Sequence, residues 1–268
     1  MNKKILITLS ALFILSGCSS QSKKEESTTK NDNAVKQERV DPDNKPHEKA
    51  MECCHKPETG EVKVVNMLGD ELSKIQADLK EKERHLVIDL RTEEEYKKGH
   101  LKYAINMPKE TFKNHIGRIR DWSMQSVILY ANTSDELAEA ANELIKDKFQ
   151  KVTIAQGVNE YTYDYVTYTN LTGSEMQKII DKEQDFFIDS RDEKDFNKAH
   201  AKNVVRVNHK DLSNIAEVLP KDKEKHIYLY DYTGDRSVTI AEKLQELGYK
   251  NITLSIDGTK ETQFYFNK

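Results

Sequence analysis

The sequence repeats itself at an offset of about 100 residues, and this repeat constrains the fold more than any other feature. The apolar run at 86–91, which ends in the pattern Asp-x-Arg, recurs at 186–191. His100 recurs as His200, the run at 127–130 recurs at 227–230, and the run at 152–154 recurs at 252–254. Two homologous units of roughly 100 residues, a common domain size, follow from this spacing.

Short apolar runs alternate with amphipathic stretches inside each unit. In the first unit the runs at 86–90, 127–130 and 152–155 predict buried strands of a parallel sheet. The amphipathic stretches predict helices at 70–82, 92–98 and 134–147, with Ser134 as the N-cap of the last. The second unit predicts helices at 174–181, 193–198 and 237–247, the last ending at Gly248. This alternation predicts an α/β fold with helices on both faces of each sheet.

The N-terminus has the pattern of an export signal. Lys3 and Lys4 precede an apolar run at 5–15, which is too short to span a bilayer comfortably. The run ends in Leu15-Ser16-Gly17-Cys18, which resembles the bacterial lipobox. That resemblance implies that residues 1–17 are a lipoprotein signal peptide and that Cys18 carries the lipid, whose two or three chains would anchor the protein. An ordinary secretory signal with an incidental cysteine is the alternative.

Residues 18–60 form a polar segment that we expect to be a flexible, lipid-anchored tether. The segment has no aromatic side chain except that of histidine and few aliphatic ones, so it cannot bury enough apolar surface to offset its ordering entropy. Cys53, Cys54 and His55 within it are soft ligands suited to Cu(I) or Zn(II). Adjacent cysteines match no closed zinc site, and a vicinal disulfide or two unpaired thiols remain alternatives.

Composition excludes several classes of protein. Lys and Arg number 42 against 46 for Asp and Glu, and the net charge of -4 argues against nucleic-acid binding, which needs a basic surface. No stretch after residue 17 approaches the length of about 20 apolar residues that a polytopic membrane protein requires. Three cysteines in 268 residues exclude a disulfide scaffold. The repeat, together with the polar segment that ends at residue 60, places the two folded units at 61–161 and 162–268.

The first unit resembles the rhodanese (thiosulfate sulfurtransferase) domain. The motif that starts at Asp89-Leu90-Arg91 continues through Glu95-Tyr96 and Gly99-His100 to the run at 104–108. The second unit matches the same pattern more weakly at 189–191, 195–196, 199–200 and 207–208. The resemblance covers 62–267 and implies two tandem rhodanese-like domains, in which His100 and His200 pack and the Asp-x-Arg residues form framework ion pairs.

Both units depart from this family where its chemistry resides. Active rhodaneses have a cysteine directly after the central strand, in a loop whose backbone N–H groups hold anions and lower the thiol pKa. Ala131 stands at that position in the first unit, and Asp231 stands there in the second. The second loop keeps three residues of the pattern, Gly234, Arg236 and Ser237. Neither unit therefore has a catalytic nucleophile for persulfide chemistry, and both are expected to be degenerate.

Two roles for Asp231 are compatible with the sequence. It could form a salt bridge with Arg236 across the loop, or it could act as a phosphoacceptor or hydrolytic nucleophile. The tyrosines at 161, 163, 165 and 168 are expected to pack between the units or to form an exposed binding patch.

The sequence thus favours a membrane-anchored, extracytoplasmic rhodanese-like protein that is a non-catalytic binding or scaffold module. Thiol or metal handling, or sulfur transfer, through Cys53-Cys54-His55 is the alternative, with copper or zinc as the metal; otherwise no cofactor is expected. Expected partners are the lipid membrane, through acylated Cys18, and a protein. The expected location is the bacterial cell membrane, or the outer membrane if the host has one.

Overall fold

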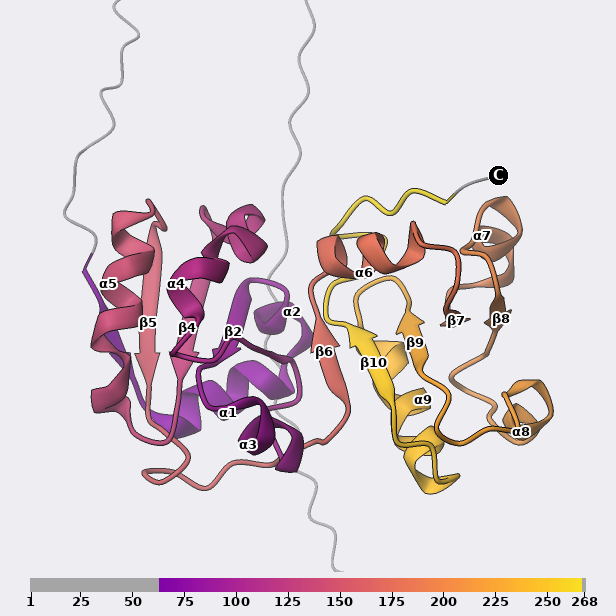
Figure 1. The fold of residues 1–268 in the computed structure, drawn as a ribbon, viewed down its shortest axis with the longest axis horizontal. Coiled ribbons are helices and arrows are strands. Elements are labelled where there is room, and N and C mark those ends of the chain that lie inside the picture. The colour runs from indigo at the N-terminus through magenta and orange to yellow at the C-terminus, as the bar shows by residue number, and fades with distance from the viewer. Residues whose placement is uncertain (1–62, 267–268) are drawn as a thin grey trace, which may run out of the picture. The chain divides into compact units, whose positions relative to one another are not determined.

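The computed structural model describes residues 63–266, and each of the two repeats in this part of the chain forms one five-stranded parallel sheet (Figure 1). The strands of the first sheet are β1 (Val65–Met67), β2 (His85–Asp89), β3 (Ala104–Asn106), β4 (Ser126–Tyr130) and β5 (Lys151–Ala155). Those of the second sheet are β6 (Thr169–Leu171), β7 (Phe186–Asp189), β8 (Val204–Arg206), β9 (Ile227–Tyr230) and β10 (Ile252–Ser255).

The two sheets have the same topology, as the sequence repeat predicts. The strand order is β1-β5-β4-β2-β3 in the first and β6-β10-β9-β7-β8 in the second. The registers also correspond, because Asp89 pairs with Tyr130 across β2 and β4, and Asp189 pairs with Tyr230 across β7 and β9. The α/β fold expected from the sequence is therefore confirmed, and β4 and β9 are the central strands.

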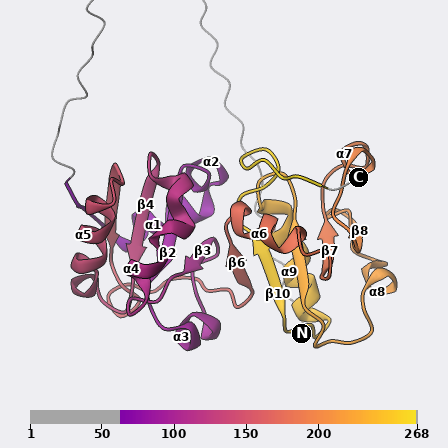
Figure 2. The same ribbon diagram turned by 45° about the horizontal axis from the view of Figure 1, so that its top comes forward.

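Helices flank each sheet. The first repeat contains α1 (Gly69–Ala77), α2 (Leu79–Lys82), α3 (Glu93–Lys98), α4 (Phe112–His115), the 3-10 helices η1 (Ile116–Trp122) and η2 (Ser134–Leu137), and α5 (Ala138–Lys146). The second contains α6 (Gly173–Ile180), α7 (Glu193–Lys198), α8 (Ile215–Val218) and α9 (Asp235–Glu246), and α9 lies alongside β9 and β10 (Figure 2). No helix among the described residues has the length and apolarity needed to cross a membrane.

Apolar residues that alternate along the strands cover both faces of each sheet. Leu86 and Ile88 of β2 belong to one buried cluster, whereas Val87 belongs to another. Ile188 and Phe187 of β7 divide between two clusters in the same way. Because successive strand residues point to opposite faces, this division is what a sheet buried on both sides requires.

The structure corrects two sequence-based predictions about helices. The helix expected at 70–82 is two helices, because Asp78 has an extended backbone and its carboxylate caps α2 by accepting from Lys80 N and Glu81 N. Ser134 is not an N-cap: it opens η2, and its hydroxyl donates to Glu160 at 2.8 Å. Gly248 ends α9 in the left-handed region at φ 86°, as predicted.

Buried and partly buried polar contacts join the two repeats. Asn170 of β6 donates through Nδ2 to the carbonyl oxygens of Lys102 and Ala104, each at 2.9 Å. Arg118 Nε donates to Glu175 Oε1 at 2.7 Å, and these two side chains are 29% and 13% exposed. The junction between the repeats is therefore an ordered, hydrogen-bonded surface.

Candidate functional site

The loops after the two central strands lie at the carboxyl ends of parallel strands, the edge at which open α/β sheets bind ligands. Ala131 directly follows β4 and begins the first loop (131–137), and Asp231 directly follows β9 and begins the second loop (231–237). Both side chains are buried, with Ala131 2% exposed and Asp231 fully covered. The position after the central strand therefore faces the interior of its loop in both repeats.

The Asp231 carboxylate is enclosed by hydrogen-bond donors of its own loop. Oδ1 accepts from Thr233 N at 2.7 Å and from Gly234 N at 2.6 Å. Oδ2 accepts from Ser237 N and from Ser237 Oγ, both at 2.7 Å. We call these three N–H groups and the hydroxyl the anion cradle. Because α9 begins at this loop, the helix N-terminus also favours negative charge here. The cradle is filled by a carboxylate that belongs to the chain.

Gly234 gives the anion cradle its shape. Its φ of 82° is in the left-handed region, and a Cβ at this position would lie 2.4 Å from Ile256 O. We expect Gly234→Ala to lower the free energy of unfolding by about 2–4 kcal/mol, because left-handed strain and a backbone clash add.

Gly248→Ala is the matched control for Gly234→Ala. Gly248 has a similar φ of 86°, but a Cβ added there would have no atom of the described residues within 4 Å, so only the conformational cost of about 1 kcal/mol applies. Urea denaturation of the two variants measures the difference. Equal losses of unfolding free energy in the two variants would show that the close approach of Ile256 O does not restrict the residue at position 234.

Arg236 does not pair with Asp231, which corrects one of the two roles considered for that carboxylate. The Arg236 guanidinium instead lies 2.9 Å from Asp192 Oδ1, and Nη1 also donates to Ser190 O at 3.1 Å. Both Asp231 oxygens are already occupied by loop donors, so Arg236 turns toward the residues after β7. Its guanidinium lies over the Tyr232 ring, 4.8 Å from the centroid.

A cavity of about 470 Å³ lies beside the second loop. Tyr232, Arg191 and Asp195 contribute to its lining, together with Lys260 and Phe264. The Tyr232 hydroxyl donates to Asp195 Oδ2 at 2.5 Å. Hydrogen bonds from Lys198 and then Tyr232 lower the pKa of Asp195 to about 2. The cavity thus keeps charged and aromatic walls, while the Asp231 carboxylate is covered and does not line it.

The first loop is also held by a carboxylate, although a different residue supplies it. Glu160 accepts from Ser134 N and Ser134 Oγ, both at 2.8 Å, and from Gly157 N at 2.6 Å. These hydrogen bonds lower the pKa of Glu160 despite its partial burial, and the bond from Gly157 N has the largest effect. Glu160 was not among the residues predicted from the sequence, although a Gly-x-x-Glu pattern at 157–160 recurs at 258–261.

The Asp-x-Arg residues are the framework ion pairs that the sequence predicts. In the first repeat Arg91 donates to both carboxylate oxygens of Asp89 and to Gly99 O at 2.8 Å. Arg191 and Asp189 repeat this geometry. His100 is fully buried and stacks on Tyr96 with ring centroids 3.6 Å apart, and burial lowers its pKa to about 4. These groups are part of the framework around the loops, and Arg191 also lines the cavity beside the second loop.

The junction tyrosines divide among several environments. Tyr163 packs in the core of the first repeat, where its ring centroid is 6.4 Å from that of Tyr130. Tyr168 is buried, whereas Tyr165 is 45% exposed. The expected packing between the units therefore does not describe the group as a whole.

Lys82 of α2 connects the first repeat to the second loop. Its side chain is 4% exposed, and Nζ donates to Thr233 O and lies 3.8 Å from Glu261 Oε2. Glu261 is the repeat counterpart of Glu160 and likewise accepts from a glycine N–H, that of Gly258, at 3.1 Å. Desolvation raises the pKa of Glu261 to about 7, although Lys82 opposes the shift.

The raised pKa of Glu261 predicts a pH-dependent stability. A carboxyl that binds protons more tightly in the folded state contributes stability below its ordinary pKa of about 4.5, and this is lost as the pH rises through about 7. The glutamine of Glu261→Gln is neutral at every pH, so this variant does not lose stability in this way. We expect its free energy of unfolding to rise relative to that of the parent by about 1–2 kcal/mol between pH 5 and pH 8, because a shift of one pKa unit corresponds to roughly 1.4 kcal/mol.

Urea denaturation of both proteins across that pH range measures the effect of Glu261→Gln. Glu160→Gln is the control from the other repeat, because the pKa of Glu160 is lowered and its replacement should give no such gain with rising pH. A parallel pH profile for the parent and Glu261→Gln would contradict the assignment.

The metal ligands expected from the sequence lie outside the described residues. Cys53, Cys54 and His55 all precede residue 63, as does Cys18, the predicted position of lipidation. Within 63–266 no group of three or more His, Cys, Asp or Glu side chains is arranged to hold a metal ion.

Comparisons with known proteins agree with the repeated fold. A sequence model of the rhodanese-like domain matches twice, at residues 70–164 and 172–263. An uncharacterized protein, YibN, of Escherichia coli K12 is 32% identical over 74 residues, 27% of this chain and 52% of that protein. The tRNA uridine(34) hydroxylase of Photorhabdus laumondii is 24% identical over 114 residues, 41% of this chain and 32% of the enzyme. The chain thus spans a third to a half of these relatives.

Among solved structures, the comparison found a thiosulfate sulfurtransferase from Pseudomonas aeruginosa, with 16% identity and a TM-score of 0.33 over 73% of this chain and 41% of that one. A rhodanese with anions from Escherichia coli has 25% identity and a TM-score of 0.29 over 31% of this chain and 98% of that one.

Proposed function

The chain belongs to the family of rhodanese-like domain proteins, and we propose that it is a membrane-anchored, extracytoplasmic member that does not transfer sulfur. Its two domains act as a binding or scaffold module for a protein partner. One observation carries the proposal: the Asp231 carboxylate occupies the anion cradle of the second loop with four hydrogen bonds.

The chemistry of sulfur transfer explains why this observation matters. A thiolate must attack the outer sulfur of thiosulfate, form a persulfide and release sulfite. A carboxylate cannot form a persulfide, and its negative charge in the anion cradle opposes the entry of a second anion. Ala131 supplies no nucleophile to the first loop, and all three cysteines of the chain precede residue 55.

The N-terminal sequence supports the location. The run at 5–15 and the resemblance of 15–18 to a lipobox favour export followed by acylation of Cys18. Two or three acyl chains, at roughly 0.8 kcal/mol for each buried methylene, would hold the protein on the outer face of the cell membrane, or on the outer membrane of a host that has one.

Thiol or metal handling is the competing function. Cys53 and Cys54 are the only thiols of the chain besides Cys18, and His55 adds an imidazole suited to copper or zinc. Thiol alkylation and titration with Cu(I) or Zn(II), compared between the parent and Cys53→Ser/Cys54→Ser, test this function. Equal metal content and equal thiol reactivity in the parent and the variant would rule out this function and leave only the scaffold function.

A thiosulfate:cyanide assay on the purified protein tests the leading proposal. We expect turnover at the level of the uncatalysed reaction, with an active rhodanese as the positive control. Robust turnover that persists in Cys53→Ser/Cys54→Ser would overturn the proposal. Turnover that disappears in that variant would instead favour sulfur transfer by the cysteines of 18–60.

A further inference from the structure

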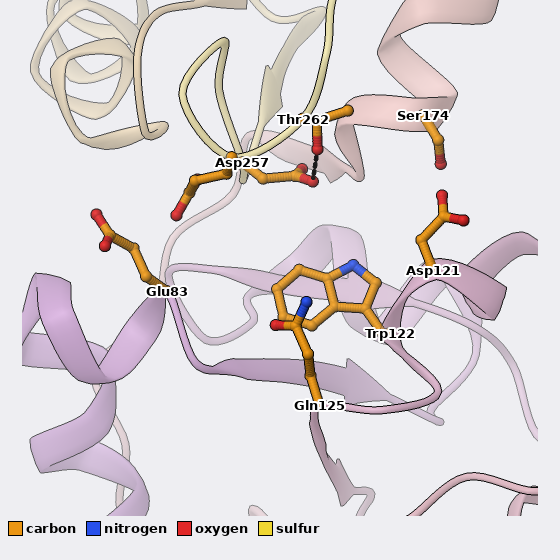
Figure 3. A pocket seen from close by; sticks show the side chains of 8 residues that line it. Glu83, Asp121, Trp122, Gln125, Ser174, Asp257 and Thr262 are labelled. Carbon is orange, nitrogen blue, oxygen red and sulfur yellow. Dashed lines mark hydrogen bonds between the residues drawn. The ribbon is translucent and has the colours of Figure 1, made fainter. Parts of the chain in front are cut away.

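A second cavity, of about 160 Å³, lies at the junction of the two repeats and is separate from the loop cavity beside Tyr232 (Figure 3). We call it the junction cavity. Four of the side chains that line it are acidic: Glu83 and Asp121 come from the first repeat, and Asp257 and Glu261 come from the second. No lysine or arginine of residues 63–266 lines it, although Lys82 Nζ lies 3.8 Å from Glu261 Oε2.

Two of these carboxylates are without partners in the described part of the chain. Neither Glu83 nor Asp121 has a side-chain hydrogen bond or ion pair there. Asp257 is 6% exposed and accepts from Thr262 Oγ1 at 2.7 Å and from Gly173 N. Negative charge therefore exceeds positive charge around the junction cavity, and part of it is uncompensated by the fold.

Trp122 provides an independent indication that the cavity takes a ligand. Its side chain is only 8% exposed, and no acceptor among residues 63–266 lies within hydrogen-bonding distance of its indole nitrogen. The nitrogen is directed toward the space between the Asp257 carboxylate and the side chains of Asp121 and Ser174 (Figure 3). The indole N–H is a donor only, and it is accessible at the cavity wall rather than sealed in the core. It can therefore donate a hydrogen bond to a ligand atom in the cavity.

We propose that the junction cavity binds a small organic ammonium cation that also carries a hydrogen-bond acceptor. The ammonium group would lie among the carboxylates, with Asp121 and Glu83 as its partners, and the acceptor would receive the Trp122 N–H. The indole adds a favourable environment for a cation. The volume equals that of about five water molecules, which limits the ligand to a few heavy atoms. The acidic side chains do not form a metal-binding group.

This proposal does not depend on the absence of sulfur transfer, because no residue of either loop takes part in it. It also has a selective reporter, since Trp122 is the single tryptophan of the chain. Fluorescence excited at the red edge of the tryptophan band therefore reports on the junction cavity alone.

Titration with ethanolamine tests the proposal, with ethylene glycol as a probe of similar size that lacks the charge. We expect a saturable change in Trp122 fluorescence with ethanolamine, on the order of millimolar affinity, and none with ethylene glycol. Calorimetry run in parallel detects binding that leaves fluorescence unchanged. Equal responses to the two probes, a response to Ca²⁺ in place of ethanolamine, or flat titrations by both methods would overturn the proposal.

A variant of the two unpartnered carboxylates locates the site. Glu83→Gln/Asp121→Asn removes two charges without removing any hydrogen bond of the described structure, so the fold should be retained. We expect it to weaken ethanolamine binding about tenfold or more, because a charge-assisted hydrogen bond contributes about 1.5–3 kcal/mol. Glu139→Gln changes an exposed carboxylate of α5 and should leave binding unchanged. Equal affinity in the two variants would place binding elsewhere and contradict the proposal.

Discussion

Asp231→Cys should convert the second loop into a persulfide-forming site. The new thiol would occupy the anion cradle, where the N–H groups of Thr233, Gly234 and Ser237 and the start of α9 now surround the carboxylate. Such donors stabilise a thiolate and lower the thiol pKa. The thiolate would attack the outer sulfur of thiosulfate, form an S–S bond and release sulfite. We expect about one cyanide-labile sulfur per chain, against essentially none in the parent.

Cyanolysis and intact-mass spectrometry measure the sulfur that Asp231→Cys acquires. The comparison is made in a Cys53→Ser/Cys54→Ser background, so that those thiols contribute nothing. Ala131→Cys is the matched control from the first loop, where Glu160 already binds Ser134 N and Gly157 N. We expect no stable persulfide in that variant. A folded Asp231→Cys protein that acquires no sulfur would show that the cradle cannot support the thiolate.

Asp231→Ala should produce a large loss of stability. The substitution leaves three backbone N–H groups and the Ser237 hydroxyl without their acceptor in a buried loop. Buried donors without acceptors lower the free energy of unfolding. Water that enters the space recovers part of this loss, and the removal of a buried charge recovers a further part. We expect the free energy of unfolding to fall by about 2–4 kcal/mol, measured by urea denaturation.

The same variant should also acquire an anion site. Sulfate or thiosulfate can replace the lost carboxylate, so either anion should raise the melting temperature of Asp231→Ala more than that of the parent. Asp135→Ala is the control. Asp135 is the counterpart in the first repeat of Asp235, and its replacement should change the free energy of unfolding by less than about 0.5 kcal/mol. Identical anion responses in Asp231→Ala and the parent would mean that the cradle collapses when it is empty.

Much of the fold could be predicted from the sequence because the inner strands are continuous apolar runs of four or five residues. The repeat at an offset of about 100 residues then required two sheets of the same kind. The edge strands β1, β3, β6 and β8 have only three residues each, which gives no recognisable run. The break at Asp78 was missed because a side-chain cap inside an amphipathic stretch interrupts the helix without changing its apolar pattern.

The sequence was enough to locate the candidate site, but it did not predict which groups contact one another there. The spacing from Asp231 to Arg236 suggested a salt bridge, because opposite charges on side chains are visible in a sequence. The backbone N–H groups that bind Asp231 instead depend on the loop conformation. Glu160 reaches the first loop from 26 positions away along the chain. The junction cavity depends on how α2, η1 and the segment after β10 pack, which no local pattern encodes.

A crystal structure of the purified protein grown with thiosulfate tests the central claim most directly, because it shows which anion occupies the cradle of the second loop. We predict that the Asp231 carboxylate remains within hydrogen-bonding distance of Thr233 N, Gly234 N and Ser237 N, with no thiosulfate bound there. Thiosulfate bound to these N–H groups, with the Asp231 side chain turned out of the loop, would contradict the claim.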